Sequence, residues 1–289
     1  MTEPTTGTQA SQLDMLLPPE VARACEAAGE RKVRMDLVTM AVLGGLAGAF
    51  IGLGAMLFTV TMTASTLGYG PARLLGGVAF SLGLILVICA GAELFTGNTL
   101  AVMAWASRRV STALLLRAWG IVYVANFAGA LLTVLLVYAT KQWSLDDARV
   151  GATALEIATA KVNLAFGQAV ALGIACNVLV TLAVWLSLAA QTFAGKVVAI
   201  VFPITAFVAA GFEHSIANSY FIPMGLLLKD ESAVRAASSV SPEQLSNLTW
   251  SGFLVDNLLP VTIGNVIGGA VLVGAVYWFV YLRGTKTGV

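Results

Sequence analysis

Two short motifs place ionisable and amide side chains deep inside apolar stretches of the 289-residue sequence. The first is Gly91-Ala-Glu-Leu-Phe-Thr-Gly-Asn98, the second is Gly211-Phe-Glu-His-Ser-Ile-Ala-Asn218, and both have the pattern Gly-x-Glu-x-x-x-x-Asn. An ionisable group at membrane depth is costly unless it faces water or finds a partner. Glu93, Glu213 and His214 are therefore candidates for a pathway that carries ions or protons.

His214 is the single histidine of the chain. In a soluble core a lone histidine is usually a packing residue. At membrane depth we favour a functional role, because imidazole is the side chain that most readily changes charge or passes a proton at physiological pH. The pair Glu213-His214 lacks the His-Glu-x-x-His spacing of a metal site, so we expect neither a metal nor another cofactor.

The carboxylates and amides of the two motifs also have a structural interpretation. Glu93 and Glu213 can accept the free N–H groups of a broken helix. For Asn98 and Asn218 we favour a role in tying down unwound backbone over contact with a permeating molecule. Non-helical backbone at this depth is tolerated only where it is buried or lines a cavity. The N-termini of half-helices also attract anions through their partial positive charge.

The elements that must position these residues are membrane-spanning helices. Only 11% of residues are charged, 58% are hydrophobic and the mean hydropathy is +0.87, so a soluble domain is excluded. The apolar runs are continuous, which indicates helices rather than strands. We predict an all-α, polytopic membrane protein with six spanning segments. They are 36–63, 73–106 with an interruption, 112–140, 159–189, 195–228 with an interruption, and 251–282.

The positive charges between these segments predict the topology. One side of the membrane receives Arg23, Arg31, Lys32, Arg34, Arg108, Arg109, Arg117, Lys196, Arg283 and Lys286. The other side receives Arg73, Lys141, Arg149, Lys161, Lys229 and Arg235. The excess on the first side predicts a multi-pass protein of the plasma membrane with both termini cytoplasmic.

We predict three regions along the chain. Residues 1–35 form a cytoplasmic segment without a cleavable signal peptide, in which Pro18–Arg34 is either an amphipathic surface helix or a simple linker. Residues 36–283 form the membrane domain, and 284–289 a cytoplasmic tail. A net charge of +1 does not point to nucleic acid, and the odd count of three cysteines does not predict a disulfide framework.

The two motifs belong to an internal repeat. Each falls in the second segment of its half, and the third segments match as well, with Asn126-Phe-Ala-Gly129 and Asn265-Val-Ile-Gly268. Three spans per half place the halves in opposite orientation, which is the inverted-repeat architecture of many transport proteins. The second and fifth helices are therefore expected to be broken.

Four further residues lie where they can influence a pore. Lys161 is expected to open the fourth span, where a lysine either extends to the interface or concentrates anions. Phe80, Leu84 and Phe207 precede the interruptions, and apolar side chains there can gate a pore or simply pack. The glycine-rich first span, which includes Gly44-Gly45, Gly48, Gly52 and Gly54, predicts close helix packing.

These same residues resemble the formate/nitrite transporter family, most of all its formate-channel branch. The resemblance covers about residues 18–283. It depends on Ala90–Asn98, on Gly211–Asn218 with Phe221-Ile-Pro-Met-Gly225, and on Asp256–Gly269. Where formate channels carry Asp and Ser-Thr, this chain has Glu93 and Gly97-Asn98.

The resemblance implies a homopentamer whose aquaporin-like protomers each contain a pore. It makes His214 the central pore residue and Thr96 its hydrogen-bonding counterpart, in a loop with Leu94 and Phe95 that faces the pore. It places Asn177 near the histidine and gives Lys161 the role of drawing anions inward. The apolar constrictions implied by the resemblance are Phe80, Leu84, Val180 and Phe207, and the loop-holding residues are Glu213 and Asn218.

The predicted function is a channel or transporter for small monovalent anions of weak acids in the lipid bilayer, with formate first and proton coupling at His214. Alternatives within transport are nitrite, hydrosulfide or lactate. A different class is an aquaporin-like pore for water or neutral solutes, disfavoured by the membrane-depth histidine and the missing Asn-Pro-Ala motif. An intramembrane enzyme is disfavoured because no Gly-x-Ser-x-Gly nucleophile motif is present.

Overall fold

The computed structural model describes residues 15–284, which are helical apart from short connections and form no β-strand. Most of the predicted tail, 285–289, and the first 14 residues of the N-terminal segment lie outside the described residues. The long helices are formed by continuous runs of Leu, Val, Ile, Ala and Gly. Such runs become helical in a membrane because a helix satisfies its backbone N–H and C=O groups internally. The predicted all-α membrane class is confirmed.

Within residues 15–284, five helices are long and apolar enough to cross a membrane. They are α2 (Leu37–Met62), α3 (Tyr69–Cys89), α6 (Thr112–Ala139), α8 (Phe166–Ala189) and the continuous stretch Gly252–Tyr281. Two shorter apolar helices, α9 (Phe193–Ala209) and α10 (Ser215–Leu228), occupy the predicted fifth span. The exact count of six spanning helices therefore stays a prediction.

Both predicted interruptions are present. α3 ends at Cys89 and is followed by α4 (Phe95–Asn98), η1 (Thr99–Ala101) and α5 (Val102–Ala106), while α9 ends at Ala209 and α10 begins at Ser215. Each break contains a left-handed glycine, Gly91 at φ 82° and Gly211 at φ 75°. A side chain is strained in that conformation, which glycine adopts freely. The backbone can therefore turn sharply after α3 and again after α9.

The predicted fourth span is wrong at its start. Lys161 does not open a spanning helix but lies in the last turn of a separate amphipathic helix, α7 (Arg149–Val162), and α8 begins only at Phe166. α1 (Pro18–Val33) has the same place in the first half, directly before α2. Its apolar face, with Val21, Cys25 and Val33 buried, packs on η1 and α5. Each half thus begins with an amphipathic helix.

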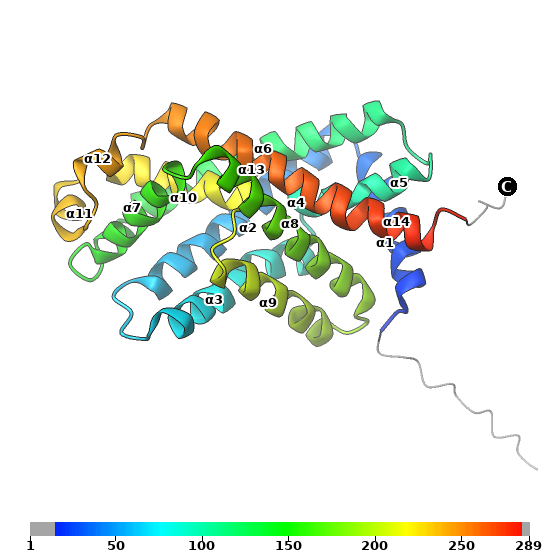
Figure 1. Cartoon of the computed structure of the whole chain (residues 1–289), viewed down its shortest axis with the longest axis horizontal. Helices are drawn as coiled ribbons and strands as arrows, with labels where there is room; N and C mark the ends of the chain where they lie inside the picture. Colours follow the sequence, from blue (N-terminus) through cyan, green and yellow to red (C-terminus); the bar gives the residue numbers. More distant parts are fainter. Residues whose placement is uncertain (1–14, 285–289) are drawn as a thin grey trace, which may run out of the picture.

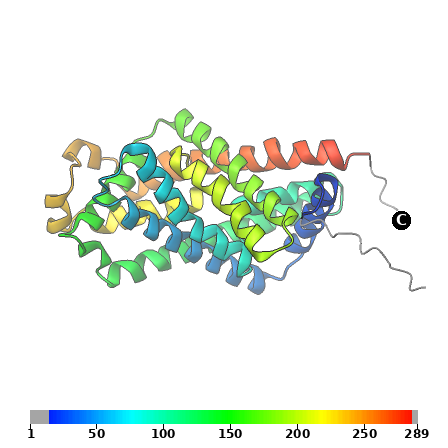
Figure 2. The same ribbon diagram turned by 90° about the horizontal axis from the view of Figure 1, so that it is seen from below.

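The two ends of the molecule are built from different segments (Figure 1). One end holds α7 with the short helices α11 (Ser232–Ala237) and α12 (Pro242–Leu245), and the other holds α1, α5 and α14 (Val276–Tyr281). The view turned by 90° shows the same separation (Figure 2). The first and last described helices therefore lie at the same end.

The last spanning stretch is not uniform. It consists of two π-helical segments, η3 (Gly252–Leu258) and η4 (Ile267–Ala275), which alternate with α13 (Leu259–Val266) and α14. A further short 3₁₀ turn, η2 (Gln142–Ser144), connects α6 to α7. π-Helical turns often mark functional positions, and here they flank the asparagine-bearing α13.

In each half, the helix that precedes the broken helix packs closely, at glycines, against the helix that follows it. A Cβ on Gly48 of α2 would lie 1.9 Å from the carbonyl oxygen of Asn126 in α6. In the second half, a Cβ on Gly268 would lie 2.3 Å from the carbonyl oxygen of Ile174 in α8. Only glycine permits this backbone approach, so the predicted close packing of the first span is confirmed and recurs in the second half.

Candidate functional site: two facing loops and two cavities

A buried asparagine holds each broken loop. Asn126 of α6 accepts a hydrogen bond from the Phe95 N–H (2.8 Å) and donates to the carbonyl oxygens of Gly44 (2.7 Å) and Glu93 (2.8 Å). Asn126 is fully buried, so its bonds replace water for the Phe95 N–H and the Glu93 carbonyl oxygen, which no helix satisfies. The first loop is thereby fixed to α2 and α6.

Asn265 of α13 repeats this arrangement in the second half. Its side chain accepts from the Ser215 N–H (2.9 Å) and donates to the carbonyl oxygens of Gly173 (2.8 Å) and Glu213 (3.0 Å). The sequence repeat had matched Asn126 with Asn265 but had assigned neither a role in the site. The signal that could have found them was the repeat itself, because an amide at equivalent depth in both halves needs equivalent partners.

Beneath the first loop, Glu93 forms a small polar cluster. Its carboxylate accepts from Asn98 Nδ2 (2.8 Å) and pairs with Lys32 Nζ of α1 at 3.0 Å. Lys32 also donates to Asn98 Oδ1 (3.0 Å). Lys32 was missed as a site residue, because it lies in the polar N-terminal segment and nothing in the local sequence connects it to Glu93.

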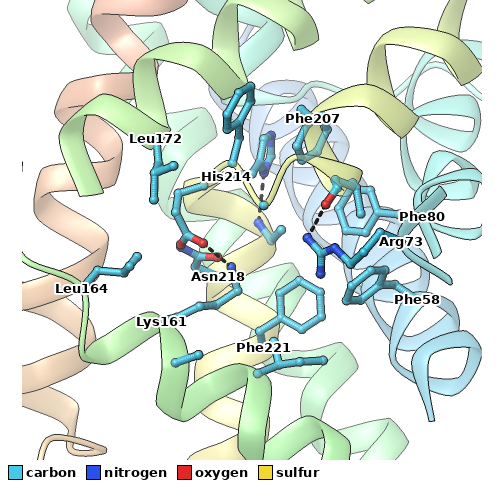
Figure 3. Close-up of a pocket in the computed structure, with 17 residues that line it drawn as sticks. Phe58, Arg73, Phe80, Lys161, Leu164, Leu172, Phe207, His214, Asn218 and Phe221 are labelled. Carbon is cyan, nitrogen blue, oxygen red and sulfur yellow. Dashed lines mark hydrogen bonds and ion pairs between the residues drawn. The ribbon is translucent and has the colours of Figure 1, made fainter. Parts of the chain in front are cut away.

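The second loop has the matching cluster. Glu213 accepts from Asn218 Nδ2 (2.7 Å) and pairs with Lys161 Nζ of α7 at 2.7 Å (Figure 3). Asn257 of η3 accepts from Asn218 Nδ2 (2.7 Å) and donates to the Lys161 carbonyl oxygen (2.9 Å), an addition with no counterpart in the first loop. The predicted loop-structural residues, Glu93, Asn98, Glu213 and Asn218, are thus brought together in two equivalent sets.

His214 is the N-cap of α10 and is 3% exposed. Its Nδ1 accepts from the Ala217 N–H (3.0 Å), and its Nε2 lies 2.9 Å from Thr96 Oγ1 in the first loop. A nitrogen that accepts an N–H is unprotonated, so the neutral ring carries its proton on Nε2 and donates it to Thr96. Adding a second proton at Nδ1 displaces the Ala217 N–H, so protonation is coupled to the start of α10.

Asn177 adds a further amide beside Thr96, the partner of the His214 ring. Asn177 of α8 is fully buried and donates from Nδ2 to the carbonyl oxygens of Thr96 (3.2 Å) and Asn265 (2.6 Å). Its Oδ1 is buried and has no hydrogen-bond partner among the described residues. The two loops therefore meet at the Thr96–His214 contact, and Asn177 connects them from the side.

Two cavities approach this contact. The α7 cavity, of about 260 Å³, is lined by Arg73, Lys161, Glu213, His214 and the phenylalanines that surround them. The α1 cavity, of about 350 Å³, is lined by Lys32, Glu93, Leu94, Asn98 and Lys196 among others. The two lining sets have no residue in common.

The predicted constriction residues are buried between and beside the cavities. Phe80 and Phe207 line the α7 cavity with their ring centroids 5.7 Å apart, and the Phe207 ring lies 6.1 Å from His214. Leu84 lines the α1 cavity. Val180 of α8, 1% exposed, lines neither of them. Phe95 packs against Tyr123 rather than lining a cavity, with ring centroids 4.9 Å apart.

No group of three or more histidine, cysteine, aspartate or glutamate side chains that could hold a metal ion occurs within residues 15–284. The polar groups at the site are one imidazole, threonine hydroxyls, amides and two lysine–glutamate ion pairs, and Arg73 and Lys196 line the cavities as further cations. Two half-helix loops facing each other between water-accessible cavities define a membrane transport protein of the inverted-repeat class.

The chain belongs to the formate/nitrite transporter family, whose sequence model matches residues 19–279. It is 42% identical to the formate channel FocA of Escherichia coli over 273 residues, covering 93% of this chain and 96% of that protein. It is 38% identical to a probable formate transporter of Methanothermobacter thermautotrophicus, covering 92% and 97% of the two chains. These relatives are channels and transporters, so the chain is a transport protein and not an enzyme.

The fold matches solved channels of the same family. A pentameric formate channel with formate bound superposes with a TM-score of 0.77 at 38% identity, covering 86% of this chain and 98% of that one. A second family ion channel superposes with a TM-score of 0.75 at 28% identity, covering 90% and 98%. The expected family membership is confirmed by these comparisons.

Proposed function

We propose that this protein is a plasma-membrane channel for the small monovalent anions of weak acids, with formate as its principal substrate. The observation that carries the proposal is the hydrogen-bonded Thr96–His214 pair between two cavities that each contain lysine. Support for the substrate class comes from the relatives that bear the name formate channel and from the solved relative with formate bound.

We assign each residue a role according to its position in the structure. Lys161 on the α7 side and Lys32 on the α1 side, each paired with a glutamate, offer ammonium N–H donors to an anion that has entered the cavities. Entry of a bare charge between Phe80, Leu84, Val180 and Phe207 is costly, because these side chains offer it no hydrogen bond. A proton delivered through His214, beside the Thr96 hydroxyl, lowers that cost, so that a weak acid crosses as neutral acid or as anion plus proton.

We further propose that the chain assembles as a homopentamer, as the solved pentameric relative does, with both termini cytoplasmic. In this arrangement residues 36–283 are the membrane domain of one protomer and each protomer conducts independently. Residues 1–35 and 284–289 then face the cytoplasm. Cross-linking in native membranes tests the pentamer, and labelling of cysteines placed in α1 and α7 from either side tests the orientation.

The deciding experiment is a substrate panel on purified protein reconstituted in proteoliposomes. Influx of formate, nitrite, hydrosulfide and lactate is compared at two pH values, and osmotic swelling with water and neutral solutes is measured in parallel. Formate flux that exceeds the others supports the proposal. Swelling by neutral solutes without anion flux would refute it in favour of an aquaporin-like pore.

A further inference from the structure

The charged groups that line the α7 cavity do not cancel. They are the cations Arg73 and Lys161 and the carboxylate of Glu213, which leaves one positive charge when His214 is neutral. Lys161 and Glu213 are 2.7 Å apart and their side chains are 14% and 6% exposed, so they act on a distant anion as a dipole rather than as a free charge. Arg73 therefore supplies the excess charge.

Hydrogen bonds to backbone carbonyl oxygens fix Arg73, and no carboxylate neutralises its charge. It belongs to the first turns of α3, and its guanidinium donates from Nε to the Ala209 carbonyl oxygen (3.3 Å) and from Nη2 to that of Val208. These carbonyls end α9 and carry the partial negative charge of its C-terminus, which a guanidinium neutralises. Among residues 15–284 Arg73 forms no ion pair.

The remaining face of the guanidinium is directed to the cavity. Nη1 makes no hydrogen bond within the described residues, and the group lies 5.6 Å from the centroid of the Phe58 ring. In Figure 3 Arg73 lies across the cavity from Lys161, with Phe221 between them and the His214 loop above. A planar donor beside aromatic walls suits a small planar anion, because the rings exclude water while the guanidinium offers parallel N–H groups.

We propose that the α7 cavity contains an anion-binding station at Arg73, and that this residue, beyond the ion-paired Lys161, gives the cavity its preference for anions. The station binds a small carboxylate or similar oxyanion at Nη1 before it reaches His214. The inference rests on the proposed transport function and adds a selectivity residue that the sequence motifs did not contain.

The test is formate and nitrite influx in proteoliposomes with the Arg73→Gln and Arg73→Lys variants. At low ionic strength Arg73→Gln is expected to slow influx about tenfold, and the deficit is expected to shrink as salt screens the charge. Arg73→Lys keeps the charge but not the parallel N–H groups, so it is expected to retain part of the native rate together with its salt dependence. Arg149→Gln removes an exposed charge paired with Asp146 on α7, outside the cavity, and serves as the control that leaves influx unchanged.

A second experiment distinguishes the proposed anion binding from a purely structural role of Arg73 as the cap of α9. It restores a charge at position 73 by chemical modification. In an Arg73→Cys, Cys89→Ser chain, a cationic methanethiosulfonate reagent is expected to restore influx and an anionic one to depress it further. Cys25 and Cys176 do not interfere because both are buried, and burial raises the pKa of the Cys25 thiol to about 12.

The outcomes separate the two proposals. Equal influx through the native and Arg73→Gln chains at all salt concentrations, or equal effects of the two reagents, would overturn the role of Arg73 while leaving the transport function intact. A native chain that passes no anion in any lipid mixture would overturn the transport function and this inference with it.

Discussion

The loop at Glu93 and the loop at Glu213 are two versions of one construction. In each, a left-handed glycine ends a half-helix, a buried asparagine from a neighbouring helix fixes the unwound backbone, and a glutamate pairs with an asparagine five residues later and with a lysine of an amphipathic helix. These shared features support the backbone and do not distinguish one side of the protein from the other.

The loops differ at the residue after the glutamate. Leu94 occupies that position in the first loop and His214 in the second, and both are N-caps of the following helix. Only the histidine caps with its side chain, and only the second loop engages a third amide, Asn257. The comparison teaches that the repeat supplies the scaffold, whereas the imidazole at which we propose proton transfer lies where the two loops differ.

The largest expected effect tests the shared scaffold. Asn265→Ala leaves the buried Ser215 N–H and Glu213 carbonyl oxygen without partners and is expected to lower the free energy of unfolding by about 3–5 kcal/mol. Asn126→Ala removes the same number of bonds from the first loop, so its effect is expected to be equal. Thermal unfolding in detergent measures both.

Asn163→Ala is the matched control, because Asn163 also makes three side-chain hydrogen bonds but is exposed at the end of α7, where water replaces them, so its loss is expected to change little. A large difference between Asn126→Ala and Asn265→Ala would break the equivalence of the two loops.

The next prediction tests the two ion pairs. Glu213→Gln leaves Lys161, 14% exposed, without a counter-charge and is expected to cost about 3 kcal/mol. Glu93→Gln leaves Lys32, 35% exposed, which water can solvate, so the expected cost is about 1 kcal/mol or less.

Adding Lys161→Met to Glu213→Gln is expected to recover part of the lost stability, whereas adding Lys32→Met to Glu93→Gln is not. If both glutamate variants unfold at the same temperature, burial does not distinguish the pairs.

The third prediction concerns variants that make the second loop resemble the first. His214→Leu removes the side-chain cap of α10, which is expected to cost about 1 kcal/mol, while His214→Asn preserves a cap. Both variants are expected to lose the part of formate flux that varies with pH between about 5 and 8, because no other imidazole is present.

The readout is the ratio of fluxes at the two ends of that pH range, measured with equal concentrations of the neutral acid. A His214→Asn variant with the native ratio would remove the histidine from proton transfer.

The smallest expected effect concerns the starts of the two long helices that follow the amphipathic helices. Asp36 caps α2 by accepting from the Thr39 N–H (2.9 Å), whereas Ala165 at the start of α8 has no such side chain. That backbone hydrogen bond lowers the pKa of the exposed Asp36 carboxyl below its ordinary value.

The stabilising contribution of Asp36 is therefore present above the ordinary carboxyl pKa and is lost as the pH falls through the lowered value. Asp36→Ala is expected to lower the melting temperature slightly at neutral pH and not at strongly acidic pH, while Asp36→Asn shows little pH dependence. A deficit that grows on acidification would contradict the cap.

Much of the fold could be predicted because its signals are local. Continuous apolar runs located the long helices, and Gly91 and Gly211 beside glutamates located both breaks. The start of α8 could not be predicted, since Asn163-Leu-Ala165 contains neither glycine nor proline and the alanine-rich α7 merges with the apolar run that follows. Lys161 was consequently assigned to the wrong helix.

The residues of the candidate site were predictable only where a motif carried them. Glu93, His214 and the two motif asparagines stood out as polar groups in apolar sequence. Lys32 and Arg73 did not, because each lies in a segment where a positive charge has an ordinary explanation at the membrane surface. Their role depends on which helix end they reach, and that information is tertiary.

The absence of any shared lining residue between the α1 and α7 cavities has a consequence for the cell. Protons travel quickly along unbroken files of water, and the side chains around Phe207 and Leu84 interrupt such a file. In the mechanism proposed above, hydronium has no separate path through the protein, so a proton would cross the bilayer only together with the anion of a weak acid.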